Sequence, residues 1–339
     1  MQILVAGGAG FIGSHTCVEL LAKGYEVVIL DNFSNSRPEV LDQIRTISGK
    51  DFKFYEVDLL DEVGVNRVFE ENDIKAVIHF AAFKAVGESV AKPIEYYHNN
   101  LTGTFVLCKV MKAHGVKKIV FSSSATVYGD PVSVPIREDF ALSATNPYGQ
   151  TKLMTEQILT DVHTSDNEWG VVLLRYFNPI GAHPSGLIGE EPNQIPNNLV
   201  PYIAKVASGE LAYLNVFGND YNTVDGTGVR DYIHVVDLSK GHTHAIDHIL
   251  GETGVKVYNL GTGTGYSVLE VLKAYEKASE REIAYKIVER RPGDIGACYA
   301  DATKAKVEIG WEAEYNLDEM CKHSWAFTMN RLGAEANEN

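Results

Sequence analysis

The residues best suited to chemistry are Tyr148 and Lys152, which lie four positions apart directly after Pro147. Proline suits the first position of a helix, so this spacing predicts that both side chains share one face of a helical turn. Ser124, at the end of a predicted strand, can reach the same space. An ammonium group near a phenol stabilises the phenolate, so we expect the pKa of Tyr148 to fall from about 10 toward physiological pH. Such a tyrosine can take a proton from a hydroxyl while the neighbouring carbon loses hydride.

The Tyr-x-x-x-Lys pattern is weak evidence alone. In a chain with 17 tyrosines, roughly one such match is expected by chance. An exposed helical Tyr and Lys is the alternative interpretation. Ser124 and a glycine pattern near the N-terminus favour the catalytic interpretation, because they supply a strand end and a ligand site beside the pair.

That glycine pattern lies in residues 3–31, which read as strand, turn, helix and second strand. Gly7, Gly10 and Gly13 allow a sharp turn, close approach to a pyrophosphate and tight packing of the helix. Asp31 ends the second strand, where a carboxylate can accept hydrogen bonds from an adenosine ribose and would repel a 2'-phosphate. The segment therefore predicts a site for NAD rather than NADP. The alternative interpretation of the glycine pattern is a tight turn that binds no ligand.

Apolar, β-branched runs alternate with stretches of helical period through the first half of the chain. We expect strands at 52–58, 76–82, 118–124 and 171–178, and helices at 38–48, 61–72, 93–114 and 147–162. This alternation predicts an α/β fold with a doubly wound parallel sheet of Rossmann type, whose ligands lie beyond the carboxyl ends of the strands. Asp58 follows one strand, where it could meet an adenine amino group or cap a helix.

The composition and the pattern of predicted elements change near residue 180. A stretch rich in Pro, Gly and Asn at 179–201 predicts a long ordered loop, and shorter mixed elements follow it. We expect residues 1–179 to form an NAD-binding domain and residues 180–339 a smaller mixed α/β lobe for the substrate, with some elements crossing back to the first. The polar tail at 333–339 is expected to fray.

Composition excludes several classes of function. The chain has 45 acidic and 30 basic residues, and its net charge of -15 opposes binding to nucleic acid and anionic membranes. No charged-then-apolar leader follows Met1, and no apolar run reaches the roughly 20 residues of a membrane span, so we expect a cytoplasmic protein. The four cysteines are widely separated, so neither a disulfide framework nor a metal site is predicted.

Several motifs resemble the extended short-chain dehydrogenase/reductase family and, within it, the UDP-glucose 4-epimerases. The broader resemblance is carried by GGAGFIGSHT (7–16), by the strand end with Ser124, and by the Tyr-x-x-x-Lys pair. The closer one is carried by FKAVGESV (83–90), FSSSATVYG (121–129), LRYFNPIGAHPSG (174–186), IPNNLVPYIA (195–204) and GTGVRDYIHVVDL (226–238). The resemblance covers nearly the whole chain.

Carried onto matching positions, the resemblance implies roles for individual residues. Tyr148 would be the base, Lys152 would also bind the nicotinamide ribose, and Ser124 would bond the sugar hydroxyl. Besides the three glycines, NAD would contact Phe11, Ile12, Asp31, Asn32, Asp58, Leu59, Phe80, Ala81, Ala82, Lys84, Asn99, Ser122 and Phe177. The UDP-sugar would contact Asn178, Asn198, Leu199, Asn215, Val216, Phe217, Arg230, the run from Arg291 to Asp294, and Cys298.

The charges among these residues make physical sense. Arg230 and Arg291 are forked donors suited to a diphosphate on an acidic protein, and Asp294 could accept from the uridine ribose. Either arginine could instead belong to a surface ion pair.

The implied reaction oxidises carbon four of the sugar, lets the keto-sugar rotate about its diphosphate link, and returns hydride to the opposite face. NAD would stay bound throughout. A nucleotide-sugar dehydratase or another extended oxidoreductase is the first alternative. The dehydratase family has a Thr-Asp-Glu motif where this chain has Ser124, Ala125 and Thr126. Ala125 and Thr126 supply neither the acid nor the base that elimination of water needs. A non-catalytic NAD-binding regulator is the second alternative, although such a protein would not need Tyr148, Lys152 and Ser124 together.

Two further expectations follow from the resemblance. Family members with a small residue at the position of Cys298 resemble enzymes that also accept N-acetylated sugars, so we hypothesise activity on UDP-N-acetylglucosamine. The alternative is that Tyr299 or a shifted loop fills the space. The helices expected at 93–114 and 147–162 resemble the pair that forms a dimer contact in this family, so a homodimer is expected.

Overall fold

The computed structural model describes residues 1–339 except 192–195, 197, 292–293 and 339. Parts of the predicted loop at 179–201 and of the implied run 291–294 therefore lie outside the described residues. The largest element is a parallel seven-stranded sheet, with its strands in the order β10 (Gly254–Leu260), β6 (Gly170–Tyr176), β5 (Lys118–Ser122), β4 (Ile74–His79), β1 (Gln2–Ala6), β2 (Glu26–Asp31) and β3 (Lys53–Glu56). The α/β fold with a doubly wound parallel sheet is confirmed.

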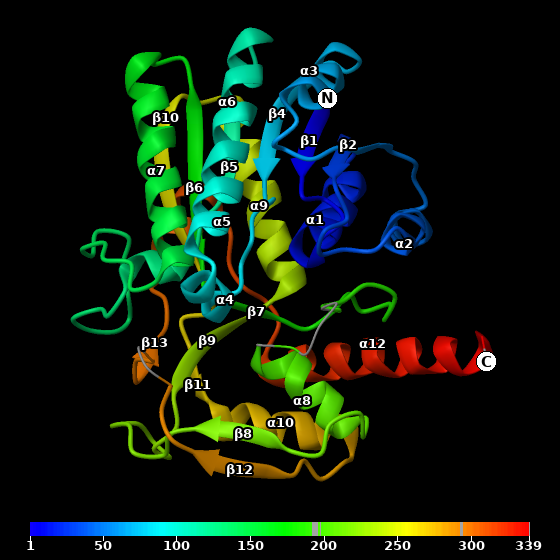
Figure 1. Ribbon diagram of the computed structural model, residues 1–339, viewed down its shortest axis with the longest axis vertical. Helices are drawn as coiled ribbons and strands as arrows, with labels where there is room; N and C mark the ends of the chain where they lie inside the picture. The colour runs from blue at the N-terminus through cyan, green and yellow to red at the C-terminus, as the bar shows by residue number, and fades with distance from the viewer. Residues whose placement is uncertain (192–195, 197, 292–293, 339) are drawn as a thin grey trace.

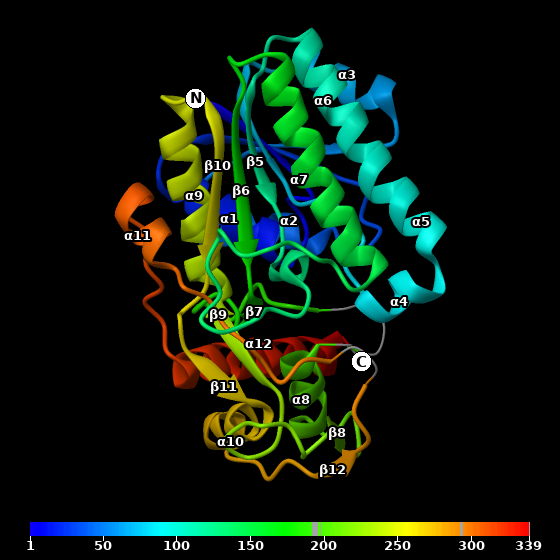
Figure 2. The ribbon, with the colours of Figure 1, turned by 90° about the vertical axis from the view of Figure 1, so that its left-hand side faces the viewer.

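Helices cover both faces of this sheet (Figure 2). One face carries α1 (Phe11–Ala22), α2 (Glu39–Ser48) and α9 (Val235–Leu250), and the other carries α3 (Glu62–Glu70), α6 (Gly103–Ala113) and α7 (Pro147–Ser165). In β1, Ile3 and Val5 pack into the first layer, whereas Leu4 and Ala6 pack into the second. Burial on both sides explains why the strands read as continuous apolar runs rather than alternating ones.

A smaller lobe lies below the carboxyl edge of the sheet (Figure 1). It contains β7 (Asn178–Ile180), α8 (Leu199–Ala207), β8 (Leu214–Phe217), β9 (Val229–His234), β11 (Gly265–Ser267), α10 (Val268–Ser279), β12 (Tyr285–Val288), β13 (Ala297–Cys298) and α12 (Leu317–Glu338). Its core is apolar and separate, built from α8, β8, α10 and the start of α12. Strand β9 is its centre, because β7, β11 and β13 all pair with it.

The chain passes between the two parts more than once. Strand β6 ends at Tyr176 and β7 begins at Asn178, so the large sheet continues almost directly into the lobe. After β9 the chain returns through α9 and β10, which pairs with β6 at the sheet edge. These crossings bring the carboxyl ends of the large sheet and the strands of the lobe together at the waist of the molecule (Figure 1).

Two expectations about helices differ from the structure. The stretch predicted as one helix at 93–114 consists of α5 (Pro93–Tyr97), a π-helical turn at His98–Thr102, and α6. Within the turn, the Asn100 amide donates to the Phe83 carbonyl at 3.1 Å and to Thr151 Oγ1 at 2.9 Å, so the widened turn lets it hold two other segments. The tail expected to fray is helical as far as Glu338.

Within the described residues, no helix combines the length and apolar character needed to cross a membrane. In the same part of the chain, His, Cys, Asp and Glu side chains nowhere gather in a group of three or more able to hold a metal ion.

Candidate active site

The turn between β1 and α1 forms a cradle that stays open because its glycines carry no side chains. Gly7 has φ +82°, and a Cβ there would lie 2.7 Å from the Ala81 amide nitrogen. A Cβ on Gly13 would lie 2.2 Å from the Gly7 carbonyl oxygen. The turn therefore packs closely against both α1 and the segment after β4. Amides at the start of a helix without side chains in the way suit a pyrophosphate.

Asp31 is buried at the carboxyl end of β2, where it holds the glycine turn in place. One carboxylate oxygen accepts from the Ala9 amide at 3.0 Å, and the other accepts from the Phe33 amide and the Ser36 hydroxyl at 2.9 Å each. A carboxylate has about four acceptor positions, so one remains for a ribose hydroxyl. Asp31 thus has a structural role besides the predicted one.

The other residues assigned to NAD surround this turn. Phe11 and Ile12 begin α1, Leu59 is buried after β3, and Phe80, Ala81 and Ala82 follow β4, with the Phe80 and Ala81 amides bonded to the Ala6 carbonyl. Asp58 accepts from the Leu60 amide and from the Asn32 side chain, both at 2.8 Å, so both of its oxygens are already engaged. Lys84 pairs with Glu190 at 3.1 Å. Asn99 lies in the π-helical turn, Ser122 ends β5, and Phe177 is buried after β6.

The catalytic candidates meet at the carboxyl end of β5. Asn146 caps α7 by accepting from the Gly149 amide at 2.8 Å, which places Tyr148 and Lys152 in the first turns of the helix. Lys152 Nζ donates to the Ser122 carbonyl oxygen at 2.7 Å and lies 5.8 Å from the centre of the Tyr148 ring. Ser124 lies close enough to the Tyr148 phenol for its hydroxyl to lower the pKa of that phenol. The structure therefore brings the three predicted residues together.

Burial changes the electrostatics that the sequence suggests. It raises the pKa of Tyr148, and the Ser124 hydroxyl offsets this only in part. Burial also lowers the pKa of Lys152 to about 7, with Glu156 opposing that shift. The prediction that the pKa of Tyr148 falls is therefore wrong for the chain's own groups, because desolvation disfavours both charged forms.

The residues assigned to the UDP-sugar come from five elements of the smaller lobe. Asn178 begins β7, Asn198 and Leu199 begin α8, Asn215, Val216 and Phe217 lie in β8, Arg230 lies in β9 and Cys298 lies in β13. Val216 is buried in the core of the lobe, whereas Phe217 is exposed, as the alternation of a strand requires.

The two arginines have different partners. Arg230 Nη1 donates to the carbonyl oxygens of Val229 and Ile295 at 2.9 and 3.0 Å, so it is held by backbone. Arg291 pairs with Asp294 at 2.8 Å, and its guanidinium lies 4.8 Å from the centre of the Phe217 ring. Arg291 therefore forms an ion pair, as the alternative interpretation expected. Its partner, Asp294, is also one of the residues assigned to the UDP-sugar.

Cys298 lies where the lobe meets the catalytic end of the sheet. It is opposite Arg230 in the pairing of β13 with β9, and it packs against the hydrophobic cluster that contains Val127 and Phe177. Burial raises the pKa of its thiol to about 11, so it acts as a small uncharged side chain. The Tyr299 ring instead lies against Gly265, where a Cβ would meet it at 3.0 Å.

Comparison with known proteins agrees with this geometry. The protein-family model described as GDP-mannose 4,6 dehydratase matches residues 4–324. The UDP-glucose 4-epimerase of Bacillus subtilis is 68% identical over 332 residues, covering 98% of each chain. The crystal structure of UDP-glucose 4-epimerase from Bifidobacterium longum in complex with NAD+ and UDP has a TM-score of 0.95 at 61% identity, covering 98% of this chain and 99% of that one. The chain belongs to the UDP-glucose 4-epimerase family.

A more distant solved structure is also similar to this chain. The UDP-Glc/GlcNAc 4-epimerase from Campylobacter jejuni is 37% identical, with a TM-score of 0.85 over 97% of this chain and 99% of that chain.

Sequence reasoning missed several residues that support the site. Glu156 and Arg175 form a buried ion pair at 2.6 Å directly behind Lys152, and Ser123 bonds the same carboxylate. The available signal was the spacing of Tyr148, Lys152 and Glu156, which puts all three on one helical face.

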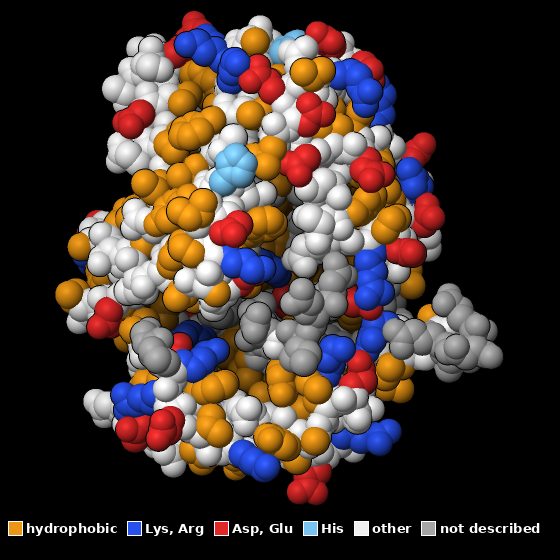
Figure 3. All heavy atoms as spheres, in the orientation of Figure 1, with side chains coloured by type: hydrophobic (Ala, Val, Ile, Leu, Met, Phe, Trp, Pro, Cys, Tyr) orange, Lys and Arg blue, Asp and Glu red, His pale blue; other side chains and the backbone are white. Residues whose placement is uncertain are grey.

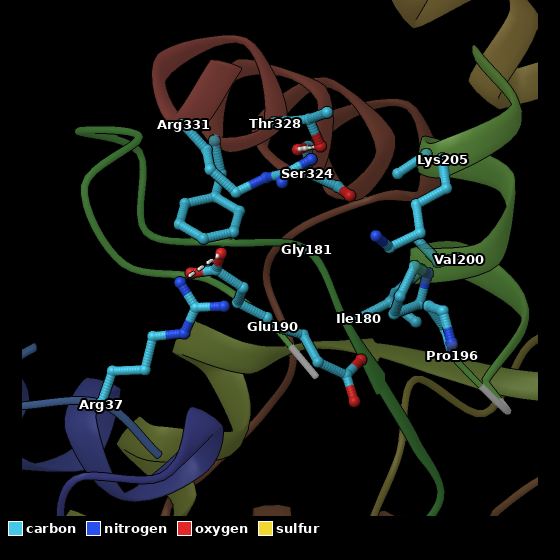
Figure 4. A pocket seen from close by; sticks show the side chains of 14 residues that line it. Arg37, Ile180, Gly181, Glu190, Pro196, Val200, Lys205, Ser324, Thr328 and Arg331 are labelled. Atoms are coloured by element: carbon cyan, nitrogen blue, oxygen red, sulfur yellow. Dashed lines mark hydrogen bonds and ion pairs between the residues drawn. The ribbon is translucent and has the colours of Figure 1, made fainter. Parts of the chain in front are cut away.

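One hollow of the structure lies away from the catalytic trio. A cavity of about 300 Å³ lies between α8, α12 and the segment after β7, with Arg37 entering from the large domain and Lys205 and Arg331 on the opposite side (Figure 4). Its cations are paired, since Arg37 contacts Glu191, and Lys205 and Arg331 contact Glu210. Elsewhere, Lys and Arg side chains gather across the waist of the molecule (Figure 3). The trio lies instead at the carboxyl end of β5, on the same edge of the sheet as the glycine turn that follows β1.

Two glycine substitutions test the cradle. Gly13→Ala should lower the melting temperature of the chain and abolish dinucleotide retention, because its Cβ would collide with the Gly7 carbonyl. Gly10→Ala is the control, since its Cβ would meet that oxygen at 3.4 Å, an ordinary contact, so its melting temperature should stay near that of the wild type. Circular dichroism melts and the dinucleotide content after gel filtration measure both. Normal melting and NAD content in Gly13→Ala would contradict the close packing.

Proposed function

We propose that this chain interconverts UDP-glucose and UDP-galactose, using NAD that stays bound through turnover. One observation carries the proposal: Tyr148, Ser124 and Lys152 converge at the end of β5 in a chain 68% identical to a UDP-glucose 4-epimerase. The enzyme class is an isomerase that acts on a carbohydrate.

The residues present fit NAD. The turn with Gly7, Gly10 and Gly13, which carry no side chains, suits the pyrophosphate, and the free acceptor position of Asp31 suits the adenosine ribose. Further contacts are proposed for the residues assigned above to NAD. Bound NAD supplies a hydride acceptor and donor and places a positive ring near the phenol.

The chain's own groups handle the proton. Tyr148 takes it from the hydroxyl on carbon four and later returns it, while Ser124 bonds the same hydroxyl. Lys152 in its ammonium form stabilises the phenolate, and its pKa of about 7 makes that form sensitive to its surroundings. Burial raises the pKa of Tyr148, so its phenolate needs positive charge besides that of Lys152, which bound NAD would supply.

The smaller lobe would hold the nucleotide end of the substrate. Arg230 and Arg291 would bind the diphosphate, and Phe217 offers an exposed ring for the uracil. Anchoring this end leaves the keto-sugar free to rotate. Rotation presents its other face, and hydride return then inverts carbon four without net oxidation.

A dehydratase is the second candidate, because the matching family model carries that description. Elimination of water needs an acid and a base next to the sugar. The residues after Ser124 are Ala125 and Thr126, which begin a 3₁₀ turn, and neither carries a carboxylate. This favours the epimerase.

The direct test incubates the purified chain with UDP-glucose and no added cofactor. UDP-galactose should form without net NADH, and Tyr148→Phe should reduce kcat at least about 100-fold. Tyr285→Phe, at an exposed tyrosine of β12, is the control and should keep wild-type activity. A 4-keto-6-deoxy product would point to the dehydratase, and no turnover despite bound NAD would point to a regulator.

We also propose that UDP-N-acetylglucosamine is a substrate. Cys298 is small, and the Tyr299 ring lies against Gly265. Cys298→Tyr should reduce kcat/KM for the N-acetylated sugar at least about tenfold, with UDP-glucose turnover changed only a few-fold, because added volume excludes the larger substituent. Cys298→Ser is the size-matched control. If the wild type turns over UDP-glucose but not UDP-N-acetylglucosamine, the proposal is rejected.

A homodimer is proposed through the face formed by α4 (Val86–Ala91), α5, α6 and α7. Apolar side chains stand out from it, including Val90, Ile94 and Phe105, which are 63, 75 and 52% exposed. Aligned on one face, they suit burial against a second copy.

Sedimentation velocity tests this contact. The wild type should sediment as twice the 37.3 kDa chain, and Phe105→Glu should sediment as a monomer, since a buried carboxylate would oppose the contact. Val307→Glu changes an exposed residue of α11 (Thr303–Ile309) and should remain dimeric. A dimeric Phe105→Glu would place the contact elsewhere.

Two further proposals concern the domain division and the cellular location of the chain. We propose residues 1–179 as the NAD-binding domain and 180–339 as the UDP-sugar-binding domain, with α9 and β10 of the second packed onto the first. A cytoplasmic location is proposed because all four cysteines are free, which suits a reducing compartment.

A further inference from the structure

Helix α7 contacts the carboxyl end of β5 residue by residue. Three of its side chains, at four-residue intervals, meet three consecutive residues: Lys152 meets Ser122, Glu156 meets Ser123, and Tyr148 meets Ser124. Two of these contacts involve the catalytic candidates. The contact of Glu156 has no part in the reaction described above.

Glu156 is buried with both carboxylate oxygens engaged. The Ser123 hydroxyl donates to one oxygen at 2.5 Å. Arg175 donates through Nε at 2.9 and 3.2 Å and through Nη2 at 2.6 Å. This fork geometry fixes the carboxylate in place.

Arg175 is itself anchored on its other side. Its Nη1 donates to the Tyr128 hydroxyl at 3.1 Å and to the Glu138 carbonyl at 3.2 Å. The Tyr128 hydroxyl donates in turn to Asn259 Oδ1 at 2.7 Å. Strands β6 and β10 and the 3₁₀ turn after β5 therefore all support the carboxylate behind Lys152.

We propose that Glu156 is a positioning residue of the epimerase: its carboxylate, clamped by Arg175, fixes the strand end that carries Ser124 and keeps Lys152 in its ammonium form. This inference rests on the proposed function. It assigns an acidic residue that touches neither the sugar nor the dinucleotide.

The charge of Glu156 acts on Lys152 against burial. Burial lowers the pKa of Lys152 to about 7, and the carboxylate one helical turn along opposes this shift. A neutral group at position 156 would remove the opposition. Lys152 would then lose its proton at a lower pH and would no longer stabilise the phenolate.

The other titratable groups around Lys152 and Tyr148 do not compensate. His79 of β4 is buried, and its pKa of about 3 leaves it neutral. Burial raises the pKa of Tyr96 of α5 and Tyr176 of β6, so both stay neutral. Burial raises the pKa of Tyr128 to about 12. The contacts of Arg175 with Glu156 and Tyr128 raise the pKa of its guanidinium, so it stays charged.

Glu156→Gln is the decisive variant, because it keeps the shape and one acceptor oxygen but removes the charge. The alkaline limb of its kcat–pH profile should move to lower pH by about one unit, which is roughly a tenfold loss at pH 8 with little loss at pH 6. The KM for UDP-glucose should stay unchanged.

Two controls separate charge from support. Glu156→Asp keeps the charge, so its alkaline limb should stay at the wild-type position. Tyr128→Phe removes the phenol that anchors Arg175 without changing a charge at neutral pH, so any loss of kcat should be the same at every pH.

A loss in Glu156→Gln that is uniform across pH, or no loss, would overturn the proposal. If that variant does not fold, Ser123→Ala tests the positioning directly, since it removes the hydroxyl that the carboxylate holds. It should lower kcat several-fold, whereas wild-type kcat in Ser123→Ala would also overturn the proposal. An inactive wild type would instead reject the proposed function.

Discussion

The contact of α7 with the carboxyl end of β5 is the constraint on which the candidate site depends. Lys152 is an amine buried in an apolar domain, and its Nζ reaches the Ser122 carbonyl while lying 4.9 Å from the centre of the Phe121 ring. Burial of an ammonium group is unfavourable unless hydrogen bonds and opposite charge offset it. The strand end supplies the first and Glu156 supplies the second. Displacement of the helix by part of a turn would remove both.

Under the proposed function, the two parts of the molecule would hold different parts of the ligands. The large sheet offers the glycine turn and the strand end, which are rigid because both faces of the sheet are covered. The smaller lobe offers Arg230 and Phe217 from strands with their own core. Because β6 passes almost directly into β7, the catalytic edge and the lobe are joined by a short connection. Such a link suits a site that must hold a nucleotide firmly while the attached sugar turns.

Local patterns predicted the features that depend on local physics. The glycine spacing at 7–13, the strand that ends at Asp31 and the helix that begins at Pro147 all follow from backbone geometry and side-chain period. The return of α9 and β10 to the large sheet depends on contacts between distant segments, so local patterns indicated only that some elements cross back.

The residues that support the site could not be predicted from local sequence patterns. Glu156 and Arg175 lie 19 positions apart and meet only because α7 crosses β6 in the fold. The pKa of Tyr148 depends on burial, which a motif does not report, and burial raises it where only the chain's own groups act. The π-helical turn likewise depends on Asn100 contacting two other segments.

The most direct test of the account is a crystal structure of the wild-type chain with NAD and a UDP-hexose bound. The account predicts that the Tyr148 and Ser124 hydroxyls both lie within hydrogen-bond distance of the oxygen on carbon four, with Lys152 still bonded at the end of β5. A sugar bound away from Tyr148, or a Lys152 side chain directed away from the strand end, would contradict it.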